Sequence, residues 1–174
     1  MKKNLLNFVK EPPAPWSNRV VIAGAGIIVS GWTLDNKVFL LSADGYSVSD
    51  PVSGERIIRN YDEDNTAFKK LSDDNLEFWI DELQQTIKTF GLRGGDGNHY
   101  IQNWRIESFT PSLGEMIIGI ENFGNRKQTV EYWEQFDLIS LTRLEYSALK
   151  YGFSPNEKHL GIFGTAGAEI FTRE

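Results

Sequence analysis

The loop at residues 94–99, Gly-Gly-Asp-Gly-Asn-His, combines a flexible backbone with two side chains that could do chemistry. Loops of this kind often contact ligands. Asp96 and His99 could act there beside a strand glutamate, since carboxylates and imidazoles transfer protons in hydrolases. The loop also resembles one repeat of a calcium-binding β-roll, but such repeats work only in stacked arrays and this one has no second copy. A small-ligand or hydrolase pocket near 94–99, with Asp96 and His99 as ligand-binding residues, is therefore one hypothesis.

Most familiar catalytic and metal-binding patterns are missing. The chain has no cysteine, which excludes thiolate catalysis, cysteine-ligated zinc and iron–sulfur clusters. Its two histidines, His99 and His159, have no metal-ligand or catalytic partner at a recognised spacing, and there is no HExxH, nucleophile elbow or phosphate loop. We expect no catalytic residue, no metal and no cofactor.

The segment Val20–Gly26 resembles the start of a dinucleotide-binding fingerprint. Asp44 follows Gly24 by 20 residues, where a ribose-binding carboxylate would stand. However, Val29 occupies the third glycine position, and Ile27–Trp32 is β-branched and too short for the crossover helix. A strand kinked by glycine is the better interpretation.

Two groups of carboxylates have spacings that could form a site. Asp62, Asp64, Thr66 and Asp73 have EF-hand-like spacing, but Ala67 stands where the loop needs glycine, so a solvated acidic loop is favoured. Five glutamates on expected strands could supply an acid–base pair: Glu107, Glu115, Glu121, Glu131 and Glu134. Strand carboxylates usually face solvent or pair with nearby arginines and lysines, so we assign them no catalytic role.

The elements that must position these residues are mainly strands. Apolar runs and turn residues predict an antiparallel meander within Val20–Asn60 and a terminal hairpin within 158–173. Three further strands are expected at 99–109, 115–121 and 128–136, giving about eight or nine in all.

Two principal helices are also expected. Over 72–90, Ser72 can cap the start, apolar residues recur at helical spacing, and Gly91 can end the helix. A second helix is expected over 140–151, with Leu141, Leu144, Ala148 and Leu149 facing inward. We therefore predict an α+β fold with an antiparallel sheet, in a single domain over 1–174 with a proline-rich lead-in at 10–16.

Charge and composition indicate which partners and which location to expect for the protein. The 174 residues carry a formal charge of −6, which argues against nucleic acid and anionic membranes as partners. No apolar run is long enough to span a bilayer, and the N-terminal residues lack a signal-peptide cleavage pattern, so a soluble cytoplasmic protein is expected. Between Asp62 and Glu82, eight acidic and two basic residues sum to −6, so this segment holds the whole excess.

Two resemblances accompany these patterns. The segments 40–56 and 152–164 are similar to parts of propeller blades, which we attribute to shared hairpin turns. Over most of its length the chain resembles a group of uncharacterised bacterial proteins, through Ser42–Gly45, Ser53–Ile57 and Gly152–Pro155 together with Ile170–Arg173 at the end. That resemblance implies a bacterial protein and implies no activity.

These observations favour a small non-enzymatic bacterial protein that acts through protein–protein interaction, for example as an immunity protein or inhibitor. Asp62, Glu63 and Asp64 are the expected partner-binding residues, and the partner is expected to be basic. The pocket near 94–99 in a ligand-binding protein or hydrolase is the alternative.

Overall fold

Antiparallel strands dominate the structure, a computed structural model that describes residues 4–62, 64, 66–91, 96–125 and 128–173. The described residues form fourteen strands: β1 (Asn18–Ala23), β2 (Val29–Trp32), β3 (Val38–Ser42), β4 (Gly45–Ser49), β5 (Arg56–Tyr61), β6 (Glu77–Ile80), β7 (Gln85–Gly91), β8 (Tyr100–Ile101), β9 (Trp104–Phe109), β10 (Ile117–Asn122), β11 (Asp137–Leu138), β12 (Lys150–Phe153), β13 (His159–Gly164) and β14 (Gly167–Thr172). Four short 3-10 helices join them: η1 (Leu5–Phe8), η2 (Ala67–Lys70), η3 (Phe123–Asn125) and η4 (Tyr132–Gln135). Within those described ranges no helix is long and apolar enough to cross a membrane.

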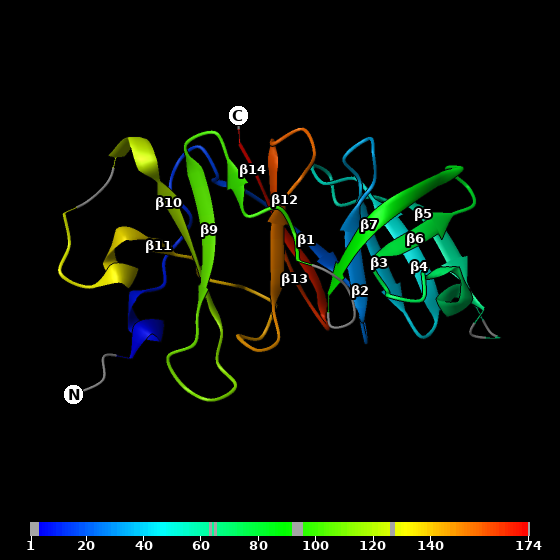
Figure 1. The fold of residues 1–174 in the computed structure, drawn as a ribbon, viewed down its shortest axis with the longest axis horizontal. Helices are drawn as coiled ribbons and strands as arrows, with labels where there is room; N and C mark the ends of the chain where they lie inside the picture. Colours follow the sequence, from blue (N-terminus) through cyan, green and yellow to red (C-terminus); the bar gives the residue numbers. More distant parts are fainter. Residues whose placement is uncertain (1–3, 63, 65, 92–95, 126–127, 174) are drawn as a thin grey trace.

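The strands form three sheets that lie in a row along the longest axis of the molecule (Figure 1). The order β11-β10-β9-β8 makes the first sheet, β1-β14-β13-β12 the central sheet, and β5-β4-β3-β2-β7-β6 the six-stranded sheet. The expected α+β class is wrong, because no described residue belongs to an α-helix.

The meander expected within Val20–Asn60 forms, but without its first strand. Strands β2 to β5 pair in sequence order, whereas β1 leaves them and pairs antiparallel with β14, with Asn18 opposite Thr172. The terminal hairpin of β13 and β14 is confirmed. Gly167 at its turn has φ +125°, and a Cβ there would lie 2.1 Å from the carbonyl oxygen of Ile22, so this close approach of β1 requires glycine.

The helix predicted over 72–90 is instead the hairpin of β6 and β7. Phe78 and Ile80 alternate with exposed residues along β6, and Ile87 opposes Phe78 across the pair. The connecting turn closes with Gln84 at φ +49° and its N–H donating to the carbonyl of Asp81. Aromatic and β-branched side chains at these positions suit a pleated sheet. Because β7 also pairs with β2, strand pairing determines the structure of this segment, although its apolar residues have helical spacing.

The helix predicted over 140–151 is a loop followed by β12. The buried carboxylate of Glu169 accepts hydrogen bonds from the backbone N–H groups of Thr142 at 2.8 Å, Arg143 at 2.8 Å and Leu144 at 3.2 Å. A carboxylate that lies three elements away along the chain therefore organises this backbone, which a local pattern does not reveal.

The strand expected over 128–136 is also wrong in its position. In the described part of that range, η4 is held by a capping box between Glu131 and Glu134, and the short strand β11 follows it.

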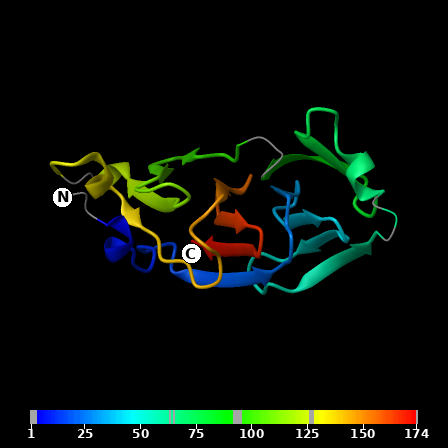
Figure 2. The same ribbon diagram turned by 90° about the horizontal axis from the view of Figure 1, so that it is seen from below.

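Apolar side chains fill the spaces between and beside the sheets. The interface of the central and six-stranded sheets buries Trp32, Leu40, Phe90, Phe163 and Ile170. The opposite face of the central sheet packs on the first sheet through residues that include Trp16, Ile118, Leu160 and Phe171. The six-stranded sheet curls around a third cluster that includes Phe39, Tyr46, Phe78 and Ile87, and Figure 2 shows this curl at one end of the molecule.

Candidate functional site

An open cleft of about 460 Å³ lies beside the β6–β7 hairpin, and it joins two regions that the sequence singled out. Its lining residues are Ser72, Asp74, Leu76, Glu77, Lys88, Thr89 and Asp96. Asp74 and Glu77 come from the acidic segment 62–82, and Asp96 comes from the 94–99 loop. We call this feature the acidic cleft.

A tight turn positions Asp74 in the lining of the acidic cleft. The Ser72 hydroxyl donates to Asp74 Oδ1 at 2.5 Å, and the Leu76 N–H donates to the same oxygen at 3.0 Å. Asn75 at φ +59° reverses the chain, and the Thr89 hydroxyl donates to its carbonyl at 2.8 Å. The hydrogen bond from Ser72 is the main cause that lowers the pKa of Asp74, and the bond from Leu76 adds to it. Asp74 therefore carries a negative charge at neutral pH.

Asp96 reaches the acidic cleft because the next residues are fixed on β12. A Cβ on Gly97 would lie 2.3 Å from the Tyr151 carbonyl oxygen, so only glycine permits this contact. The Phe153 N–H donates to the Asn98 carbonyl at 2.8 Å. The Asp96 carboxylate is largely exposed, with its Oδ1 3.2 Å from the ammonium of Lys150.

The acidic cleft has an uneven charge and an apolar margin. Three carboxylates, those of Asp74, Glu77 and Asp96, line it together with the ammonium of Lys88, which stands opposite Glu77 on the paired strand. The Lys150 ammonium, outside the lining, pairs with Asp96. Leu76 is 43% exposed in its lining, and Trp79, two residues after Glu77 on the same side of β6, is 39% exposed. This combination suits a cationic group carried on an apolar stem.

His99 does not join Asp96 in the acidic cleft. Its ring stacks on that of Tyr151, with centroids 4.5 Å apart and planes inclined by 22°. Burial against this ring is the main cause that lowers the pKa of His99, so the imidazole is neutral at neutral pH. His99 does not line the acidic cleft, but the negative charges of Asp96 and Glu107 are near enough to act on its pKa, in the direction opposite to burial. The pocket that uses Asp96 and His99 therefore stays a prediction.

Asp62 and Asp64, two of the three residues predicted to bind a partner, differ in their exposure to solvent. Asp62 is buried, and its carboxylate accepts from the Thr66 hydroxyl at 2.8 Å and from the Ala67 N–H. The bond from Ala67 is the main cause that lowers the pKa of Asp62. Asp64 is exposed, and Glu63 lies outside the described residues. Asp62 therefore organises its own loop, and Asp64 is the one of the two described residues that faces solvent.

Two of the five strand glutamates come together around one arginine. Arg105 on β9 forms an ion pair with the buried Glu121 on β10, and its Nε lies 4.0 Å from Glu107. The Tyr132 hydroxyl donates to Glu107, and the guanidinium lies 5.3 Å from the ring centroid of Phe123. Arg105 neutralises both carboxylates, which favours a structural role over an acid–base pair.

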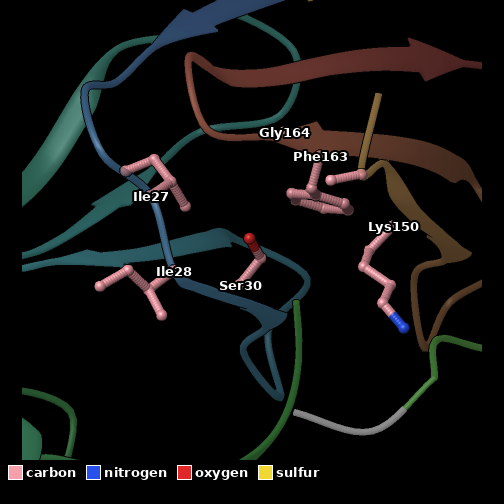
Figure 3. Close-up of a pocket in the computed structure, with 7 residues that line it drawn as sticks. Ile27, Ile28, Ser30, Lys150, Phe163 and Gly164 are labelled. Atoms are coloured by element: carbon pink, nitrogen blue, oxygen red, sulfur yellow. The ribbon is translucent and has the colours of Figure 1, made fainter. Parts of the chain in front are cut away.

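A small cavity between the central and six-stranded sheets is too small for a ligand (Figure 3). Its volume is about 10 Å³, which matches about one water molecule. Ile27, Ile28, Ser30 and Phe163 line it, and the Lys150 ammonium points away from Ser30. The cavity is a packing gap.

Metal ligands do not gather in the described ranges, where no three histidine or acidic side chains are placed to hold an ion together. Comparison with protein-family models, curated proteins and solved structures gives no match to this chain. The geometry of the clefts is therefore the basis for assigning function.

Sequence reasoning missed the cleft residues Glu77 and Lys88 as a cross-strand pair. Both lie within the range 72–90, for which a helix was predicted. The alternation of Phe78 and Ile80 with Glu77 and Trp79 was the signal that pointed to a strand.

Proposed function

We propose that this chain is a non-enzymatic protein that binds another protein, and that the acidic cleft receives a lysine or arginine side chain of that partner. The observation that carries the proposal is the lining of three carboxylates and the Lys88 ammonium beside exposed Leu76 and Trp79. A long basic side chain places its methylene groups on apolar surface and its charge among carboxylates.

The electrostatic field of the molecule supports the same partner. The segment Asp62–Glu82 carries the net charge of −6, and the acidic cleft lies along it. A basic partner would be attracted to this end of the molecule, which speeds association and discriminates against acidic proteins. An immunity protein or inhibitor that covers a basic toxin is one form of this function.

The test compares variants of the full chain that remove equal charge. Glu77→Gln/Asp96→Asn changes the acidic cleft, and Glu55→Gln/Glu145→Gln changes two exposed carboxylates elsewhere. We expect wild type and the second variant to retain one basic partner from a bacterial lysate, and the cleft variant to bind that purified partner roughly tenfold or more weakly. Affinity should also fall as salt rises from low to physiological concentration. Equal affinity of all three proteins for the partner would contradict the proposal.

A further inference from the structure

A second cleft, of about 260 Å³, lies where the connection from β1 to β2 meets strands β3 to β5. Its lining residues are Ala23, Gly24, Ala25, Ile27, Leu40, Ser42, Asp44, Ser47, Arg56 and Arg59. Figure 2 shows β1 and β5 along the same edge of the molecule, on either side of this junction. We call this feature the arginine cleft, and it shares no lining residue with the acidic cleft.

A β-bulge directs both arginines to the same side of β5. Arg56 stands opposite Ser49 and Arg59 opposite Ser47, with the register shift between Val48 and Ser49. In a regular strand, residues three apart face opposite sides, but the extra residue at the bulge restores them to one side. The bulge therefore allows both arginines to line one cleft.

The donors of the arginine cleft are not used within the protein. Among the described residues, neither Arg56 nor Arg59 forms an ion pair or a side-chain hydrogen bond, and the Arg59 guanidinium lies over the Tyr61 ring at 4.5 Å. Ser47 lines the cleft, and in the same described part of the chain its hydroxyl forms no hydrogen bond with the protein. A serine hydroxyl and two guanidiniums that line one cleft and have donors to spare form an arrangement that an anion would satisfy.

Asp44 gives the arginine cleft an acceptor as well. Its N–H bonds to the Ser42 hydroxyl at 3.3 Å, which fixes the turn, and its carboxylate lines the cleft without an ion pair to any described residue. A carboxylate at this place repels a second anionic group but accepts hydrogen bonds from hydroxyl groups. Ile27 and Leu40 add apolar surface between the two ends of the cleft.

The cleft does not have the geometry of a dinucleotide site. The chain after Gly24 continues into β2 without a helix, and the Gly24 N–H is used by the carbonyl of Ala166 at 2.9 Å. A volume of about 260 Å³ lies below the range of about 300–1,000 Å³ for drug-sized ligands, which points to a smaller molecule.

We propose that the arginine cleft binds a small phosphorylated polyol, of the class of sugar monophosphates. Arg56, Arg59 and the Ser47 hydroxyl hold the phosphoryl group, because two arginines match the charge of about −1.5 to −2 of a phosphate monoester at neutral pH. Asp44 accepts hydrogen bonds from the hydroxyl groups, and Leu40 contacts the carbon frame.

Isothermal titration of the full chain with ribose 5-phosphate, ribose and inorganic phosphate tests this assignment. We expect ribose 5-phosphate to bind more tightly than inorganic phosphate, and ribose to give no heat of binding. Arg56→Ala/Arg59→Ala should weaken ribose 5-phosphate binding at least tenfold. Asp44→Asn should weaken ribose 5-phosphate binding but leave phosphate binding unchanged.

Matched controls separate this result from general effects of charge. Arg143→Ala removes an exposed arginine elsewhere and should leave binding unchanged. Circular dichroism of each variant checks that its fold is intact. Absence of binding by ribose 5-phosphate, equal binding by the double arginine variant, or equal loss in Arg143→Ala would overturn the proposal. The acidic cleft is unchanged in all these variants, so their outcome does not depend on the protein-partner function.

Discussion

The β6–β7 hairpin and the loop 140–149 each add apolar side chains to the core, but they are held by different forces. The hairpin satisfies its backbone by strand pairing and inserts Phe78 and Ile80 into the third apolar cluster. The loop has no strand partner over Thr142–Leu144, and the carboxylate of Glu169 accepts its N–H groups instead.

The hairpin is held by many separate contacts, whereas the backbone of the loop is held mainly by one carboxylate. Removal of one side chain from the hairpin leaves its backbone pairs in place, so the damage is a cavity in the core. Removal of Glu169 withdraws the acceptor for several backbone groups at once. Substitutions in the two regions can therefore lower the free energy of unfolding by similar amounts and still differ in where they accelerate hydrogen exchange.

The largest expected loss comes from Phe78→Ala in the hairpin. Phe78 is fully buried against Phe39 and Tyr46, with ring centroids 4.7 and 5.2 Å away. We expect the free energy of unfolding to fall by about 3–5 kcal/mol in urea titration. The control Thr86→Ala, on the exposed side of β7, should change it by about 0.5 kcal/mol or less. A small effect of Phe78→Ala would show that the hairpin is not part of the core.

A somewhat smaller loss is expected from Glu169→Ala. It leaves three backbone N–H groups without their acceptor, and rearrangement of the loop toward water offsets part of the penalty, so we expect a loss of about 3 kcal/mol. Hydrogen exchange at residues 142–144 should accelerate far more than exchange in β6 and β7. The matched control is Glu145→Ala, on the same loop and exposed. Unchanged exchange at 142–144 would contradict the role of Glu169.

The smallest of these effects concerns the polar contact that joins the hairpin turn to β4. The Tyr46 hydroxyl donates to Glu82, and the Asn60 amide donates to the same carboxylate at 3.2 Å. Tyr46→Phe should lower the free energy of unfolding by about 1 kcal/mol at pH 7.

The stability difference between wild type and Tyr46→Phe should depend on pH, because the Tyr46 hydroxyl can lose its proton. Burial, and then Glu82, raise the pKa of Tyr46 above its ordinary value of 10.0. The stabilisation is therefore complete below pH 10 and is lost as pH rises, by about 1.4 kcal/mol per unit. The advantage of wild type over Tyr46→Phe should vanish near about pH 11 in urea titrations, and a constant difference from pH 7 to 11 would contradict this assignment.

Part of the fold follows from local patterns, and part depends on distant pairing. Strands β2 to β5 and the β13–β14 hairpin were predicted because their apolar runs are divided by clear turn residues. The segment 72–90 has apolar residues at spacings that suit a helix and a hairpin alike, and pairing of β7 with β2 decides between them. The loop 140–149 depends on Glu169, which no local pattern links to it.

The candidate sites were predictable to a similar degree. The acidic charge of Asp62–Glu82 and the position of Asp96 were visible in the sequence, whereas their meeting in one cleft required the hairpin. Arg56 and Arg59 were not predicted as site residues, and their three-residue spacing on a regular strand indicates opposite faces. Only the bulge in the register of β4 and β5 brings them together.

The pairing of β1 with β14 also bears on how the protein matures on the ribosome. Strands β2 to β7 can fold together while the second half of the chain is still being synthesised, but β1 must wait for Gly167–Thr172. Until then, the exposed hydrogen-bonding groups of β1 are open to mispairing with other chains. The turn at Gly167 allows β14 to form a hairpin with β13, and β1 can then pair with β14 and is no longer open to mispairing.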